Sequence, residues 1–169
     1  MQVLDLKTGV DFGAKGNLKE FSPTGFSPEP DAVSTWSEAP VAQLIFRLPP
    51  MPHDLQFTIE VFPYLVDEWV PRQEIWVFFN GLFTHYQSIK APVEMSFTVP
   101  RELFNARANR FSFALPNAAS PSELGLGTDM RKLGLAFVKL GAADPRNAAV
   151  PARSGPQPGA AAGPRRPQR

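Results

Sequence analysis

Short runs in which apolar and polar residues alternate are the feature that most constrains the fold of this chain. The clearest run covers residues 55–61, where every second side chain is apolar: Leu55, Phe57, Ile59 and Val61. Further alternating or apolar runs cover residues 3–6, as a first edge strand, and residues 42–48, 74–79, 82–86, 93–99, 109–115 and 133–140. Alternation with a period of two places one face of a strand in a core and the other in solvent. The pattern therefore predicts strands that each bury one side.

These runs number about eight, are spaced roughly ten residues apart and are separated by Gly, Pro and Asn turns, which is typical of a sandwich of two sheets. The chain also holds 19 prolines, which interrupt helices, and 14 phenylalanines, which favour a β-rich core. We predict an all-β fold: a single jelly-roll-like β-sandwich of antiparallel strands formed by residues 1–141.

The last part of the chain, residues 142–169, differs in composition from the rest. It has six prolines and almost no large apolar side chain, so we predict a disordered tail. Residues 141–169 hold five arginines and one aspartate, whereas residues 1–140 hold twelve basic and fifteen acidic residues. The mildly acidic body argues against nucleic acid as the partner. The basic tail either is simply solvated or contacts an acidic partner or a membrane surface.

The residues that most enzymes and metal sites require are scarce. There is no cysteine, and the two histidines, His53 and His85, show no metal-ligand spacing, so we expect neither a metal nor a cofactor. No nucleophile elbow, Walker or Rossmann motif occurs, and we expect no enzymatic activity; a small hydrolase that uses two carboxylates is the least favoured alternative. No secretory signal or membrane-spanning run is recognised, so the expected location is cytoplasmic.

Aromatic residues offer a possible binding surface. In the run at residues 74–79, Trp76 and Phe78 lie on the face opposite Ile75 and Val77, and Asn80 with Gly81 forms a hairpin turn. Aromatic rings exposed on a sheet suit the apolar faces of sugars. Two alternatives remain: the rings are covered by residues 63–72 or by the N-terminal segment, or they form a protein interface.

The polar loop at residues 116–131 is the second candidate. Glu123, Asp129 and Arg131 in this loop either contact a sugar, hold a calcium ion through the two acids, or simply hold the loop in place, with Arg131 paired to an acid such as Glu38. The segment Trp36-Ser37-Glu38 either contacts the ligand or packs against this loop.

Several segments resemble a known accessory domain. They are residues 13–17 (GAKGN), 25–29 (GFSPE), 36–38 (WSE), 77–81 (VFFNG) and, above all, 115–134 (LPNAASPSELGLGTDMRKLG). The resembling domain is a β-sandwich similar to carbohydrate-binding modules and is attached to bacterial glycosyltransferases and other proteins of surface-polysaccharide biosynthesis. The resemblance covers about residues 11–140. This chain departs from it after Glu38, where Ala39 and Pro40 replace the frequent glycine.

The resemblance implies a non-catalytic glycan-binding or polysaccharide-biosynthesis accessory module, whose partner is a glycan or a glycosyltransferase. The alternative is a protein–protein interaction subunit of a larger assembly that docks through its aromatic face or its basic tail. The candidate ligand contacts are Trp36, Glu38, Trp76, Asn80, Glu123, Asp129 and Arg131.

Overall fold

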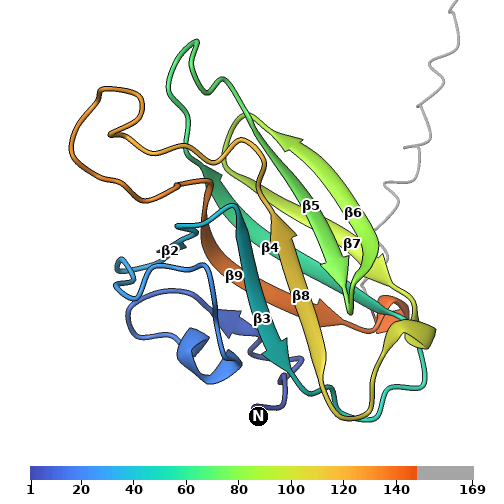
Figure 1. Ribbon diagram of the computed structural model, residues 1–169. Helices are drawn as coiled ribbons and strands as arrows, with labels where there is room; N and C mark the ends of the chain where they lie inside the picture. The colour runs from blue at the N-terminus through green and yellow to red at the C-terminus, as the bar shows by residue number, and fades with distance from the viewer. Residues whose placement is uncertain (148–169) are drawn as a thin grey trace, which may run out of the picture.

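A computed structural model describes residues 1–147, which form nine strands and three short 3-10 helices (Figure 1). The strands are β1 (Val10–Asp11), β2 (Thr35–Trp36), β3 (Val41–Phe46), β4 (Leu55–Pro63), β5 (Gln73–Phe79), β6 (Leu82–Ile89), β7 (Val93–Val99), β8 (Asn109–Ala114) and β9 (Leu135–Ala143). The 3-10 helices are η1 (Leu18–Phe21), η2 (Arg101–Leu103) and η3 (Pro145–Asn147). None of the helices in this part of the chain is long and apolar enough to cross a membrane.

The strands form two antiparallel sheets that pack face to face. The front sheet has the order β3-β8-β5-β6, and the back sheet has the order β1-β9-β4-β7, with β2 also paired to β9 (Figure 1). From β2 onward the strand pairs are nested along the chain. The first strand, β2, pairs with the last, β9, and inside that pair β3 pairs with β8. This nested pairing across two sheets is a jelly roll, which confirms the predicted all-β sandwich.

The core lies between the sheets and is built from the predicted apolar faces. Phe111 of β8 is at its centre, with its ring centroid 4.9 Å from that of Phe57 on the back sheet and 5.0 Å from that of Phe79. All three rings are fully buried, and each such side chain contributes roughly 1.5–3 kcal/mol. The inward residues are therefore committed to packing, and the outward residues are free for other roles.

The structure differs from the sequence prediction at both ends of the domain. An edge strand is predicted at residues 3–6, but only Val3 forms an isolated bridge, to Arg47. The last strand, β9, continues to Ala143, two residues past the predicted boundary at residue 141, because β4 supplies the pairing partners Gln56 and Phe57. Most of the predicted tail, residues 142–169, lies outside the described residues.

Candidate functional site

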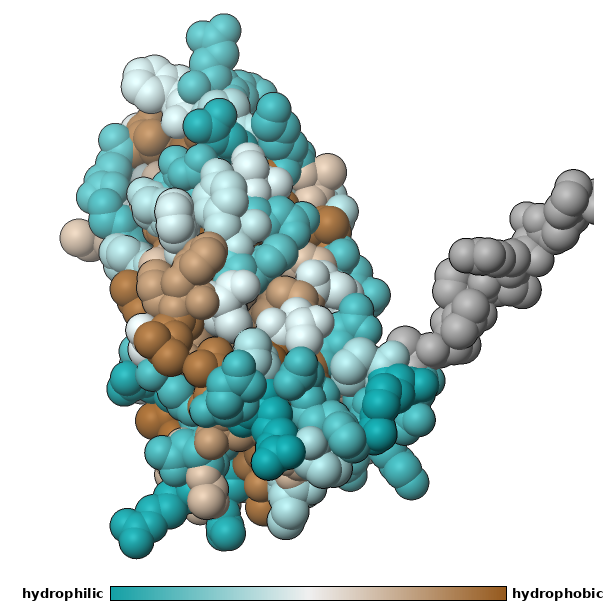
Figure 2. All heavy atoms as spheres, turned by 90° about the vertical axis from the view of Figure 1, so that its right-hand side faces the viewer, coloured by the Kyte–Doolittle hydropathy of each residue, from teal (hydrophilic) through white to brown (hydrophobic). Residues whose placement is uncertain are grey.

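The outer face of the front sheet carries a row of aromatic side chains. Trp76 of β5 lies directly opposite Tyr86 of β6, and Phe78 lies opposite Phe83. Trp76, Phe83 and Tyr86 expose 42%, 56% and 41% of their surface, while Phe78 is partly buried beneath its neighbours. We call these four residues the aromatic face. Figure 2, which views the molecule from the β6 side, shows hydrophobic side chains gathered toward the left among polar ones. The interpretation in which a loop covers Trp76 is therefore wrong.

The rings of the aromatic face touch one another. The centroid of Trp76 lies 4.9 Å from that of Tyr86 and 5.6 Å from that of Phe83. Phe83 in turn lies 6.1 Å from Phe78, with the two rings nearly perpendicular at 71°. Rings at these separations attract one another, which restricts their rotation. The face is therefore a continuous and largely fixed surface.

A bulge in β6 decides which residues take part. The hairpin turn has Asn80 at φ 50° and Gly81 at φ 85°, as the predicted two-residue turn requires, and counting from this turn places Phe83 opposite Phe78. The register then shifts between Val77 and Phe78, so that Tyr86, rather than the preceding residue, lies opposite Trp76. An extra residue in one strand exchanges the two faces of everything beyond it.

Two observations show how the bulge is held. The hydroxyl of Thr84 donates to the carbonyl of Val77 at 3.1 Å. His85 faces the other way from Tyr86 and stacks on Phe97 of β7, with centroids 5.1 Å apart and an interplanar angle of 14°. The bulge thus moves a histidine toward the core side and a tyrosine into the aromatic face.

Polar groups border the aromatic face on two sides. On the β3–β8 side, Gln43 donates from its Nε2 to the Ser112 hydroxyl at 3.0 Å, in the same cross-strand row as Phe78. At one end, the Tyr86 hydroxyl donates to Glu74 Oε1 at 3.1 Å, and this hydrogen bond raises the pKa of Tyr86. Arg72 Nε lies 3.4 Å from the same Glu74 oxygen. Donors and acceptors therefore lie beside the exposed rings.

The charged residues of the long loop are partnered within that loop or with Lys132, the residue that follows it. Arg131 forms a two-pronged ion pair with Asp129, with its Nη2 2.7 Å from Oδ2 and its Nε 3.0 Å from Oδ1. This pair holds the pKa of Asp129 at about 2, below its ordinary 3.8, and raises that of Arg131. Glu123 forms an ion pair with Lys132, which lowers the pKa of the Glu123 carboxyl. These contacts support the interpretation that the charges hold the loop.

The remaining candidates lie apart from Trp76. Trp36 is partly buried, and its ring meets that of Tyr64 edge to face at 6.3 Å. Glu38 lies beside the long loop, since its carbonyl accepts the Lys132 N–H at 3.2 Å. Asn80 lies in the hairpin turn, and its Nδ2 donates to the Leu103 carbonyl at 2.8 Å, so its amide serves the fold.

The structure thus places the seven candidate residues in three regions. Trp36, Glu38, Glu123, Asp129 and Arg131 gather at the loop end of the sandwich, Trp76 lies on the aromatic face, and Asn80 lies at the hairpin. Sequence reasoning missed Phe83 as a candidate, although the Asn-Gly turn gives its position opposite Phe78. It did not place Tyr86 on the same face, because the bulge that puts it there has no clear sequence signal.

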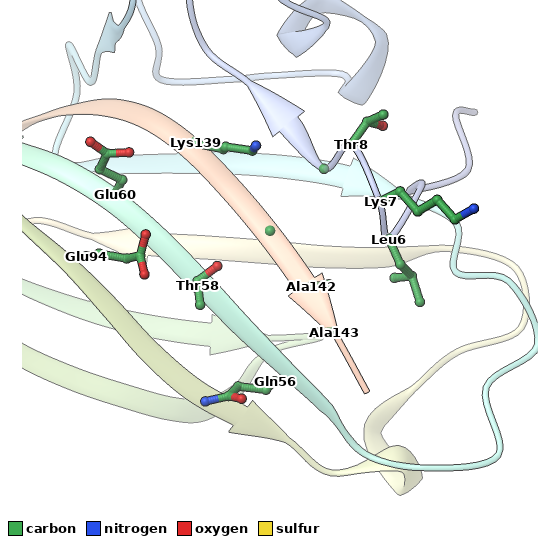
Figure 3. Close-up of a pocket in the computed structure, with 12 residues that line it drawn as sticks. Leu6, Lys7, Thr8, Gln56, Thr58, Glu60, Glu94, Lys139, Ala142 and Ala143 are labelled. Atoms are coloured by element: carbon green, nitrogen blue, oxygen red, sulfur yellow. The ribbon is translucent and has the colours of Figure 1, made fainter. Parts of the chain in front are cut away.

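A groove lies on the outer face of the back sheet, on the other side of the molecule (Figure 3). It has a volume of about 260 Å³ and lies between residues 6–9 and strands β4, β7 and β9. Glu60 is paired in register with Glu94 on one side and with Lys139 on the other. Polar and small aliphatic residues line the groove, and no aromatic side chain is among them. It therefore lacks the stacking surface that the front sheet provides.

Neither the groove nor the loop forms a metal site. Among residues 1–147 no group of three or more His, Cys, Asp or Glu side chains is placed to hold a metal ion. The aromatic face is consequently the strongest candidate site in the described part of the chain, and its chemistry is recognition by stacking and hydrogen bonding.

Comparisons with known proteins give limited information. No protein-family model and no curated protein matches the chain. Among solved structures, a carbohydrate-binding module, CBM36, in complex with calcium and xylotriose is similar over 72% of this chain and 86% of its own, with 8% identity and a TM-score of 0.36. The xylan-binding module CBM15 is similar over 82% of this chain and 92% of its own, with 12% identity and a TM-score of 0.40. At these identities and TM-scores the ligands of those modules do not transfer, and a function must rest on this chain's own residues.

Proposed function

We propose that this protein binds glycans without catalysing a reaction and that the aromatic face is its binding surface. The observation that carries the proposal is the contiguity and exposure of Trp76, Phe83 and Tyr86 on a rigid sheet. Pyranose rings present apolar C–H faces that lose water favourably against aromatic rings. Because the rings are already held by their neighbours, little ordering is needed when a ligand binds.

The polar neighbours fit the same ligand class. Sugar hydroxyls require donors and acceptors at the edge of the stacking surface. Gln43 and Ser112 lie along one side of the rings, and Glu74 with Arg72 lies at the end near Tyr86. An arrangement of rings and hydrogen-bonding groups side by side suits a glycan better than a dry apolar partner.

We further propose that this binding serves polysaccharide biosynthesis, as an accessory to a glycosyltransferase. The support is the resemblance of residues 115–134 to domains attached to such enzymes. Co-purification of the tagged full-length chain from its native cells tests this role. Recovery of a glycosyltransferase with the chain would support it, and repeated recovery without one would contradict it.

A glycan array probed with the full-length chain tests the binding proposal. The informative variant is Trp76→Ala, and its matched control is Trp69→Ala, because Trp69 is 77% exposed and lies in the loop between β4 and β5. Each change removes one exposed tryptophan, so any loss of nonspecific hydrophobic binding affects the two variants equally. Thermal unfolding of both variants verifies that the fold is retained.

We expect Trp76→Ala to weaken binding by about tenfold or more, since losing a stacked ring costs on the order of 1.4 kcal/mol. Trp69→Ala should bind like the wild type. Equal binding by folded Trp76→Ala and wild type would remove the aromatic face as the site. Absence of any bound glycan would contradict the proposed function itself.

A protein partner is the second candidate function, and one observation favours it. Leu82 and Phe83, at the start of β6, are 55% and 56% exposed, so both faces of the hairpin near its tip present an apolar side chain. Aromatic and apolar residues are also enriched at the centres of protein interfaces. If the array is blank, a partner protein whose capture is lost in Trp76→Ala but kept in Trp69→Ala would establish this alternative.

A further inference from the structure

Two arginines lie at one end of the aromatic face, on the same outer face of the front sheet. Arg110 of β8 is paired in register with Ile45 of β3, and Arg47 lies two residues after Ile45, directly after the end of β3. Alternation along both strands directs these two side chains outward, and both are exposed. Diagonal neighbours of this kind in an antiparallel pair lie roughly 7–8 Å apart.

Arg110 is also a diagonal neighbour of the aromatic face. Ser112, two residues along β8, is paired with Phe78 of β5. The same geometry therefore places Arg110 roughly 7–8 Å from Phe78, at the edge of the stacking surface. A charged group on a sugar stacked against Phe78 and Phe83 would lie within reach of the Arg110 guanidinium.

No ion pair of the described residues involves Arg47 or Arg110. The ion pairs in this part of the chain involve Arg72, Arg131, Lys132 and Arg146. The guanidinium groups of Arg47 and Arg110 are thus not committed to a carboxylate of residues 1–147. Guanidinium groups bind carboxylates and phosphates through two parallel hydrogen bonds, so free ones near a binding surface select anionic ligands.

A hollow continues the surface past Arg47. It has a volume of about 360 Å³, and Arg47, Arg101, Met51 and Phe104 are among its lining residues. Arg101 donates from Nη1 to the Pro52 carbonyl at 3.0 Å, which fixes its guanidinium beside the hollow. The outer face of the back sheet differs in charge, since Glu60 and Glu94 lie together there with Lys139. Positive charge without paired acids is thus a feature of the front sheet at this end.

We propose that the ligand of the aromatic face is an acidic glycan, whose carboxylate or phosphate groups are bound by Arg47 and Arg110. This inference rests on the proposed glycan-binding function and adds the class of sugar. Sugar rings stack along the aromatic face, and their charged substituents are directed toward the arginine end. Single-stranded nucleic acid also combines rings with negative charge. Its backbone requires a continuous basic groove, whereas this face offers two arginines on a body that is mildly acidic.

The test uses the full-length chain on an array that holds uronic-acid, phosphorylated and neutral oligosaccharides, with an oligothymidylate as the nucleic-acid probe. The variant Arg47→Gln/Arg110→Gln removes the two charges, and Lys7→Gln/Lys139→Gln is the matched control, because both lysines line the groove of the back sheet. Calorimetric titration then compares the strongest anionic glycan with a form of it in which the charge is masked, such as a methyl ester.

We expect anionic glycans to be the strongest ligands and the arginine variant to bind them about tenfold more weakly, or about 1.4 kcal/mol. The lysine control should bind normally, and added salt should weaken wild-type binding because the arginines are exposed. Binding of neutral glycans that needs Trp76 but not the arginines would overturn this inference and leave the proposed function intact. A blank array, or tighter binding of oligothymidylate, would overturn both.

Discussion

Alanine substitutions at two glycines with the same backbone conformation test how tightly residues 24–26 pack on β3. Gly25 has φ +73° and Gly125 has φ +70°, a region that L-residues rarely adopt. A Cβ atom at Gly25 would lie 2.2 Å from the Val41 carbonyl oxygen and 3.0 Å from the Cα of Ala42. At Gly125 no heavy atom lies within 4 Å of that position. The two alanine substitutions therefore share the conformational strain, and only Gly25→Ala adds a collision with backbone.

The difference in stability between the two variants follows from these contacts. Left-handed strain costs roughly 1–2 kcal/mol, so Gly125→Ala should lose about that much stability. Gly25→Ala must also displace β3, and overpacking adds about 1–3 kcal/mol, for a total of roughly 2–5 kcal/mol. Urea denaturation of the full-length chain measures the free energy of unfolding of each variant.

The displacement should also reach the proposed site. Residue Thr24 forms an antiparallel bridge with Gln43, whose amide borders the aromatic face. We therefore expect Gly25→Ala to weaken glycan binding at temperatures where it is still folded, and Gly125→Ala to leave binding unchanged. Equal losses of stability in the two variants would refute the packing argument, whatever their effect on binding.

Three further predictions concern the core, the loop and the bulge. Phe111→Ala should lower the free energy of unfolding by about 3–5 kcal/mol, because it removes the ring at the centre of the core; a smaller loss in urea denaturation would mean that the core collapses into the cavity. The pKa of Asp129 is about 2 in the fold against an ordinary 3.8, so its contribution to stability is present above about pH 4 and is lost as the pH falls toward 2. The difference in urea midpoint between wild type and Asp129→Asn should shrink over that range, and a difference independent of pH would contradict the ion-pair explanation. Deletion of Thr84 should remove the bulge and keep Tyr86 opposite Trp76, because His85 and Tyr86 then become the third and fourth residues after the turn; glycan binding and the exposure of Tyr86 to iodination should both be retained, and a loss of iodination would show that the register is set elsewhere.

The sequence predicts the strands and the hairpin because both depend on local chemistry. Alternation in residues 55–61 reflects which side of β4 is buried, and Asn80-Gly81 adopts the positive φ angles that few other pairs tolerate. The sandwich follows from these elements, since each sheet must cover one apolar face. Position along a strand therefore gave the outward direction of Trp76 correctly.

Exposure of Trp76 depends on distant segments and does not follow from local sequence. Residues 63–72 fold back on themselves through the bridge between Val66 and Val70 and do not cover β5. The N-terminal segment bridges the edge of the front sheet at Arg47 and then pairs with β9 through β1, so it does not cover β5. Likewise, Asp129 and Arg131 are two positions apart in the sequence. Only the geometry of the loop shows that they pair with each other instead of pointing toward a ligand.

The outward positions of the two sheets, compared within one molecule, give the last argument for the site. On the back sheet these positions are polar: Gln56, Thr58 and Glu60 on β4, and Glu94, Ser96 and Thr98 on β7. On β5 and β6 the equivalent positions hold Trp76, Phe78, Phe83 and Tyr86. Packing of the core places no demand on an outward residue, and exposed rings favour association with other molecules over solubility. A surface of this kind on one sheet, bordered by Gln43, Glu74 and two arginines that form no ion pair within residues 1–147, fits the proposed ligand, which stacks, hydrogen-bonds and carries negative charge.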